Sequence, residues 1–157
     1  MHILEYTLQV VNSDILEVNG FSWSGIWAPE TKWKNDTNED DAFLTVRYAS
    51  GAWSTLAMTS IDSRPNANWF KITGTKGTYL MNWDAGEIVT HDGNKTISTR
   101  IPNQQGEGWK LYQNIADHLT KGEKLIITPE WARRPIHILD LACRSAKKGA
   151  SLRAKYK

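Results

Sequence analysis

The sequence predicts an α+β fold: an open, mainly antiparallel β-sheet of about seven strands with helices packed on one face. Residues 41–60 and residues 69–82 each contain two β-rich runs joined by a glycine-bearing turn, which is the pattern of a β-hairpin. Helical periodicity lies near the two ends of the chain, in residues 1–12 and 109–148. Strands and helices that are segregated in this way favour helices on one face of an antiparallel sheet.

Composition narrows the class of protein. A chain of 157 residues can bury roughly 68–70% of its unfolded surface, so residues 1–157 are predicted to form a single domain. The single cysteine, Cys143, cannot form an internal disulfide and is expected to be a small buried hydrophobe in a reducing, cytoplasmic compartment. The net charge of +2 is too small to favour nucleic acid or a membrane surface. Glu5 and Gln9 interrupt the first apolar run, which argues against a signal peptide or a spanning helix.

The first 24 residues predict a helix followed by a strand. Apolar residues recur at helical spacing in residues 1–12: Ile3, Leu4, Leu8 and Val11. This helix begins inside its periodic pattern without a cap, so the chain is expected to be cut from something longer. Residues 15–24 alternate as a strand does, and Gly20 is the expected position of a bend or bulge.

Residues 41–60 form the centre of the predicted sheet. Leu44 and Val46 are assigned to the core, and the alternate positions Phe43, Thr45 and Arg47 to the opposite face. Later hairpins turn at residues 74–77 and 92–93.

The C-terminal part predicts two helices and a last strand. Residues 109–121 carry one apolar stripe and end at Gly122. Thr128 is the expected N-cap of the second helix, which Pro135 should kink. Residues 151–156 alternate as an edge strand.

The long polar loop at residues 25–40 carries Trp27 and Trp33, and Pro29 excludes a central strand there. A loop of this length in a compact domain is usually functional or mobile. No glycine-rich phosphate loop, zinc-ligand spacing or nucleophile elbow occurs in the sequence, and the four histidines are scattered. The basic residues near the C-terminus fit a solvated face better than a nucleic-acid site.

Several segments resemble the C-terminal domain of the glucose-fructose oxidoreductase/inositol dehydrogenase/MocA family. They are NEDDAFLTVRYASGAWSTLAMTS, KITGTKGTYLMNW, and YQNIADHLTKGEKL with PEWARRPIHILDLACRSAKKGASL, and together they cover nearly the whole chain. The resemblance implies an open antiparallel sheet that follows a dinucleotide-binding Rossmann domain, which this sequence lacks. NAD(P) is therefore expected as the cofactor of the full-length parent, with no cofactor site and no metal site in this chain.

The resemblance also implies a catalytic residue. The family signature is an Asp four residues ahead of a His that opens a helix, and His2-Ile3-Leu4-Glu5 resembles its second half. His2 is thus the candidate catalytic histidine, while the Asp would fall before Met1. The parent is expected to be an NAD(P)-dependent dehydrogenase acting on a sugar, sugar acid or cyclitol, and this chain alone is expected to be inactive.

Trp27, Trp33 and Arg64 are the candidate substrate-binding residues, on the loops expected to approach the missing domain. The alternative is that both tryptophans only pack the loop down. A rival function is a stand-alone carbohydrate-binding module with Trp27, Trp33 and Trp69 as stacking platforms. A weaker rival is an RNA-binding sheet.

The open face of the sheet is the expected site of self-association. The helices can cover only one face, and the other presents Phe43, Thr45, Arg47 and Trp53. Aromatic residues and Arg are enriched at interfaces, so a homo-oligomer with two-fold symmetry is expected. A solvated face is the alternative.

Overall fold

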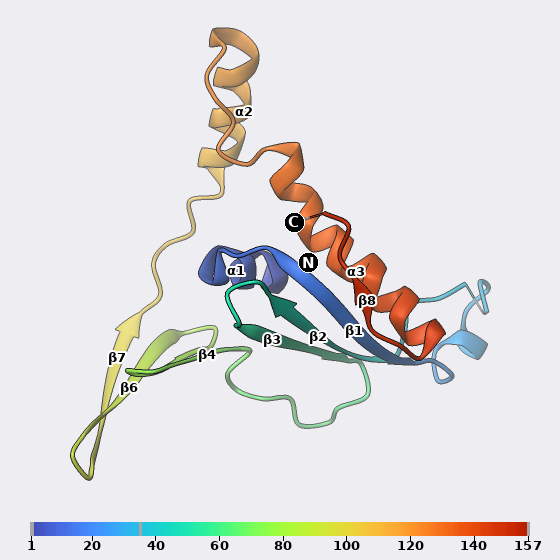
Figure 1. Cartoon of the computed structure of the whole chain (residues 1–157), viewed down its shortest axis with the longest axis horizontal. Helices are drawn as coiled ribbons and strands as arrows, with labels where there is room; N and C mark the ends of the chain where they lie inside the picture. Colours follow the sequence, from blue (N-terminus) through green and yellow to red (C-terminus); the bar gives the residue numbers. More distant parts are fainter. Residues whose placement is uncertain (1, 35, 157) are drawn as a thin grey trace. The chain divides into compact units, whose positions relative to one another are not determined.

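The computed structural model describes residues 2–34 and 36–156, and divides the chain into two compact units (Figure 1). The first unit comprises residues 1–62 and 126–157, and the second unit comprises residues 63–125. The α+β class is confirmed, but the strands form two four-stranded antiparallel sheets instead of one sheet of about seven. The prediction that residues 1–157 are a single domain stays a prediction, and each unit is described by itself.

The first unit has one sheet with the strand order β3-β2-β1-β8. Its elements are α1 (His2–Val11), β1 (Ile15–Trp23), a short 3-10 helix η1 (Ala28–Glu30), β2 (Asp41–Tyr48), β3 (Trp53–Thr59), α3 (Pro129–Lys148) and β8 (Leu152–Arg153). Met1, where the predicted first helix begins, lies outside the described residues. The last strand is at the sheet edge, as predicted, although it is shorter than residues 151–156.

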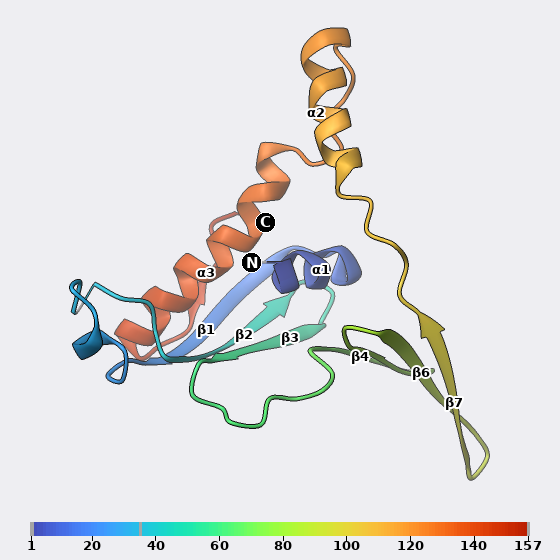
Figure 2. The ribbon, with the colours of Figure 1, turned by 180° about the vertical axis from the view of Figure 1, so that it is seen from behind.

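The core of the first unit lies between this sheet and the two helices. Leu44, Val46 and Tyr48 on β2 are buried, whereas Phe43 and Arg47 are exposed, which confirms the predicted faces. The helices close the same cluster with Leu4, Leu8, Ile138, Leu141 and Ala142. Both views of the chain show α3 lying along β1 (Figures 1 and 2). One face of the sheet is therefore covered by helices.

Gly20 on β1 lets α3 approach closely. A Cβ at this position would lie 2.2 Å from the carbonyl oxygen of Ala142, so no larger residue fits without moving the helix. The backbone N–H of Gly20 donates to the Ser145 hydroxyl at 2.9 Å, and that hydroxyl donates to Ala150 O at 2.7 Å. The bulge predicted at Gly20 is wrong, because the register of β1 shifts between Ile15 and Glu17. The glycine allows α3 to pack closely against β1, and a bend at this position stays a prediction.

The ends of α3 follow the predicted capping chemistry. Thr128 is the N-cap, and its hydroxyl accepts the backbone N–H of Trp131 at 3.2 Å. Gly149 ends the helix with a φ of 66°. Pro135 lies inside the helix without ending it. The buried Cys143 expected from the apolar pattern is wrong: the side chain is exposed, because this helix turns it away from the sheet, near Glu39.

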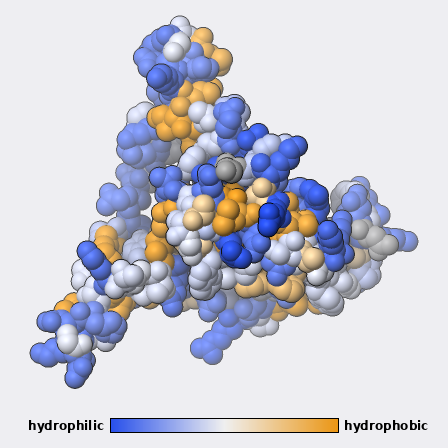
Figure 3. Space-filling model, viewed as in Figure 1, coloured by the Kyte–Doolittle hydropathy of each residue, from blue (hydrophilic) through white to orange (hydrophobic). Residues whose placement is uncertain are grey.

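The second unit contains a meander of four strands followed by a helix. The strand order is β4-β5-β6-β7, and the elements are β4 (Phe70–Gly74), β5 (Gly77–Met81), β6 (Ala85–Asp92), β7 (Lys95–Pro102) and α2 (Trp109–Lys121). Gly122 ends α2 in the left-handed conformation, as predicted. No residue of α2 is buried, and Figure 3 shows apolar side chains on this helix at the surface. Residues 125–127, the alternative short strand, form a connector.

Candidate functional site

The loop between β1 and β2 is organised around Asp40, whose side chain is buried. The carboxylate accepts backbone N–H groups from Gly25 at 2.7 Å, Ile26 at 2.9 Å and Trp27 at 3.4 Å. The N–H of Ile26 does most to hold the pKa of Asp40 below its usual 3.8; burial opposes it, and the N–H groups of Gly25 and Trp27 add to it. The ionised carboxylate therefore holds the backbone of residues 25–27, the first residues of the loop, in place.

Asp40 also links the loop to the sheet through its backbone. Its N–H donates to Trp23 O at 2.9 Å, and its carbonyl accepts the N–H of Ser60 at 2.9 Å. The Ser60 hydroxyl donates to the same carbonyl at 3.0 Å and accepts the indole N–H of Trp27 at 3.1 Å. Trp27 is thus held by a hydrogen-bonded chain that starts at a buried residue, while half of its surface stays exposed.

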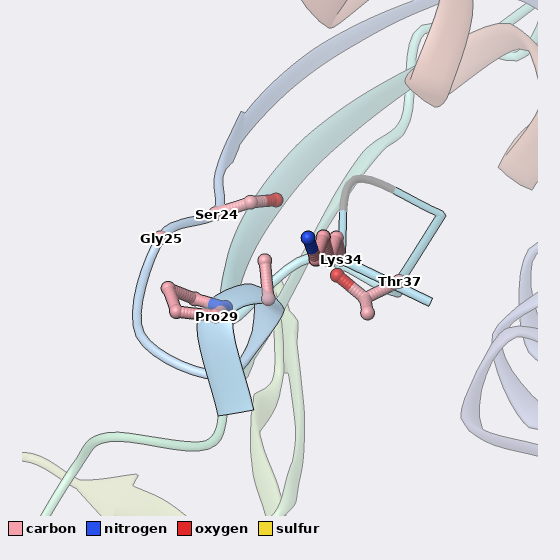
Figure 4. Close-up of a pocket in the computed structure, with 6 residues that line it drawn as sticks. Ser24, Gly25, Pro29, Lys34 and Thr37 are labelled. Carbon is pink, nitrogen blue, oxygen red and sulfur yellow. The ribbon is translucent and has the colours of Figure 1, made fainter. Parts of the chain in front are cut away.

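A hollow of about 510 Å³ opens within this loop (Figure 4). It is lined by Ser24, Gly25, Ala28, Pro29, Lys34 and Thr37. Figure 4 shows the hydroxyls of Ser24 and Thr37 and the amino group of Lys34 directed towards the same space. Two hydroxyls and one ammonium group can donate hydrogen bonds to a polar ligand, and both hydroxyls can also accept them. We define these residues as the loop hollow.

The two predicted tryptophans lie on the loop that forms the hollow, but neither lines it. Trp33 is 61% exposed, and the ammonium group of Lys32 lies 4.5 Å from the centre of its ring. Trp27 is fixed by its hydrogen bond to Ser60, whereas Trp33 is the more exposed of the two. The packing alternative thus describes Trp27 better than Trp33, and the binding role of both stays a prediction.

The other two predicted site residues lie elsewhere. His2 is exposed at the start of α1, which precedes β1, whereas the loop follows β1. His2 is not among the residues that line the loop hollow. Arg64 is exposed and belongs to the second unit. The roles of His2 and Arg64 stay predictions.

A second hollow of about 300 Å³ lies in the first unit, between the end of α1 and the start of α3. It is bordered by Arg134, which is buried and donates to Ser13 O at 2.7 Å. The guanidinium also lies 4.8 Å from the ring of Trp131. Arg134 therefore joins the turn after α1 to α3. Its contacts serve the packing of these elements, and we do not assign a ligand to this hollow.

Sequence reasoning missed Asp40, Ser60, Ser24, Lys34 and Thr37 as parts of one arrangement. Asp40 had a signal, because it directly precedes a strand and follows a long loop that begins with glycine. The others carry no local pattern. Hydroxyl residues in loops are common, and only the folded loop brings these together.

Neither a membrane-spanning helix nor a metal site is found in residues 2–34 and 36–156. In these ranges no helix combines the length and apolar character that crossing a bilayer requires. Histidine, cysteine and carboxylate side chains there do not gather into a group of three that could hold a metal ion.

Comparison with solved structures identifies the fold. An NAD-binding protein from Listeria innocua is 17% identical with a TM-score of 0.75, and the match covers 98% of this chain and 45% of that one. Levoglucosan dehydrogenase in complex with NADH is 17% identical with a TM-score of 0.77, covering 99% and 49%. Aldose-aldose oxidoreductase from Caulobacter crescentus, complexed with glycerol, is 13% identical with a TM-score of 0.72, covering 97% and 45%. At these identities the likeness shows the fold alone.

The chain spans about half the length of these solved structures. A search of curated proteins found no match. The model for the oxidoreductase family, C-terminal alpha/beta domain, matches residues 8–154. Because this match takes in both sheets, α2, α3 and the end of α1, the chain belongs to the Gfo/Idh/MocA oxidoreductase family as its C-terminal domain.

Proposed function

We propose that this chain is the substrate-binding and self-associating part of an NAD(P)-dependent oxidoreductase that acts on a sugar, sugar acid or cyclitol. The family match over residues 8–154 carries the proposal. Levoglucosan dehydrogenase with NADH and the aldose-aldose oxidoreductase with glycerol, both of this fold, support a polyhydroxylated substrate. The loop hollow fits such a ligand, because it presents hydroxyls and an ammonium group, and the same loop carries the exposed indole of Trp33.

The described residues do not fit the nicotinamide cofactor itself. A dinucleotide needs backbone N–H groups of a glycine-rich turn that leads from a strand into a helix. The connector from β7 to α2 has Gly106 and Gly108, but Leu111 stands where the fingerprint needs its third glycine, and α3 begins at Thr128-Pro129 without a glycine. NAD(P) is therefore proposed for another part of a full-length protein. His2 is proposed to exchange the proton of the substrate hydroxyl, and a cytoplasmic location is proposed from the lone thiol.

Calorimetric titration with NADH and with NADPH tests whether the cofactor site lies outside this chain. We expect no saturable binding of either dinucleotide to the chain. A micromolar dissociation constant would contradict the proposal, because it would require a cofactor site within these residues.

Tryptophan fluorescence during titration with inositol, glucose and gluconate tests the substrate site. We expect weak, saturable quenching that Trp33→Ala removes. Trp109→Ala is a matched control, since Trp109 is 63% exposed against 61% for Trp33 and lies on α2 in the second unit. Equal responses in the two variants, or none in the unmodified chain, would remove substrate binding from this loop.

The exposed Trp33 also keeps the carbohydrate-binding module as a second candidate. Such modules use aromatic faces as stacking platforms, so a module should prefer an oligosaccharide to the monosaccharide. A parent dehydrogenase site should show no such preference. Parallel titration with glucose and a glucose oligomer therefore separates the two functions.

A further inference from the structure

We propose that residues 154–156 form a pH-sensitive latch. His137 on α3 holds residues 154–156 against the first unit while its ring is neutral, and releases them when the ring is protonated. The proposal concerns the docking of residues 154–156 and is independent of the proposed catalytic function.

The latch depends on one hydrogen bond of fixed direction. The backbone N–H of Lys155 donates to Nε2 of His137 at 3.2 Å. A backbone N–H can only donate, so Nε2 must present its lone pair, and the neutral ring carries its proton on Nδ1. Protonation of Nε2 places two N–H groups face to face. The bond is then replaced by a repulsive contact.

The same ring packs against the end of the chain. The Tyr156 ring meets His137 edge to face, with centroids 4.9 Å apart and planes at 68°. The guanidinium of Arg133 lies 3.9 Å from the centre of the Tyr156 ring. The Lys155 ammonium lies 5.5 Å from the same ring centre, so protonation of His137 would add a third cation beside Tyr156.

Short backbone pairing and the packing of Ala154 against the core also hold this segment. β8 consists of two residues, which pair with Glu17 and Val18 of β1. One further backbone bond joins Ala154 N to Leu16 O at 2.9 Å. Ala154 is thus held by the sheet and the core, whereas His137 contacts the two residues that follow it, Lys155 and Tyr156.

The charges around His137 favour the neutral ring. Burial does most to lower its pKa below the usual 6.5; Asp140 opposes this, and Arg133 and Arg144 add to it. On the chain end, Arg153 and Lys155 are also cationic. Glu17 on β1 pairs with Arg47 at 2.9 Å, and Glu5 on α1 accepts the indole N–H of Trp131.

The lowered pKa sets the direction of the switch. The docking of residues 154–156 is most stable above the pKa of a free histidine. It weakens as the pH falls from there towards the lower pKa that His137 has in the folded chain. Release would leave the edge of β1 without the partner that Ala154 provides. The latch thus controls whether one backbone carbonyl at this sheet edge, that of Leu16, is free.

Nitrogen–proton NMR between about pH 7.5 and pH 5 tests the latch on the whole chain. We expect the Lys155 amide resonance to shift with the same midpoint as the His137 ring. Hydrogen-exchange protection of the Lys155 amide should fall about two- to thirteenfold after correction for chemical exchange, as the loss of one hydrogen bond predicts. An amide that does not titrate, or protection that does not change, would overturn the proposal.

Two variants test whether the pH dependence at Lys155 comes from His137 or from an effect of low pH on the whole protein. In His137→Gln the carboxamide oxygen can accept the same bond at every pH, so the pH dependence at Lys155 should disappear. In His118→Gln it should remain, because His118 is an exposed histidine of α2. Protection of β2 amides reports whether each variant is folded. Should His137→Gln unfold, Tyr156→Ala serves in its place, with reduced protection at Lys155 expected at pH 7.5. Unchanged protection there would also overturn the proposal.

Discussion

The two units carry sheets of equal strand number that differ in how they are covered. In the first unit, helices close one face, and ten buried side chains form a single cluster. In the second unit, Ala85 and Gly86 are the only buried residues among 63–125, all of which the structure describes. Ladder hydrogen bonds are present in both sheets, so the difference lies in apolar burial. Burial is the dominant favourable term in folding, and the first unit should be the more stable one.

The second unit nevertheless has apolar residues to bury. Its helix α2 exposes Leu111, Tyr112, Ile115 and Leu119, the stripe that the periodicity predicts. Trp83 is 84% exposed, although its ring lies 5.3 Å from that of Trp69. Apolar pattern alone therefore does not produce a core, because a second apolar surface must meet it.

Gly20→Ala should reduce the free energy of unfolding the most, because it disturbs the packing of α3 on the first sheet. The new methyl group would overlap the Ala142 carbonyl, so α3 must move away from β1, at a cost of more than about 3 kcal/mol. Urea unfolding measures this cost. Gly106→Ala is the control, since a Cβ there meets nothing within 4 Å. Similar losses in the two variants would mean that close packing at Gly20 is unimportant.

The same substitution in each unit measures the difference between them. Ile138→Ala removes a fully buried side chain from the first unit and should cost about 2–5 kcal/mol. Ile97 on β7 is 46% exposed, so Ile97→Ala should cost less than about 1 kcal/mol. Hydrogen exchange should likewise be slower in β2 than in β6. Equal costs, or faster exchange in β2, would contradict the comparison.

Asp40→Asn tests how much the buried carboxylate of Asp40 stabilises the first unit. The variant should be less stable at neutral pH, because an amide replaces a carboxylate that accepts three N–H groups. The pKa of Asp40 is lowered on folding, so its stabilisation is present above pH 3.8 and is lost as the pH falls through the folded value. The difference in melting temperature should therefore shrink towards pH 2. Asp41→Asn is the control, and a difference independent of pH would contradict the role of the charge.

Phe43→Glu tests the open face of the first sheet and should barely change stability. Phe43 is 40% exposed and lies beside Phe21, with ring centroids 6.2 Å apart. If this face joins two copies, as we propose, light scattering should show a dimer at tens of micromolar that the charge converts to a monomer. Leu119→Glu, on α2 in the second unit, should leave the dimer intact. A monomer from the start, or a dimer that survives Phe43→Glu, would exclude this face.

Local sequence determined most of the secondary structure. The alternation of β2 defined its buried face, because side chains of a strand point to opposite sides at every residue. Thr128, Gly122 and Gly149 marked helix ends, because capping depends on one residue and its own neighbours. Local motifs also resembled one family, and the family match over residues 8–154 confirms that assignment.

Tertiary structure decided what depends on residues far apart in the chain. Gly20 was assigned to a bulge, because nothing near it in sequence reveals that Ala142 packs against it. Cys143 followed an apolar helical pattern but faces outward, since the sheet selects which stripe of α3 it covers. The loop hollow likewise exists only because Asp40 gathers the start of a long loop against the end of β1. Sequence periodicity describes one element at a time, whereas burial and binding sites require the elements to meet.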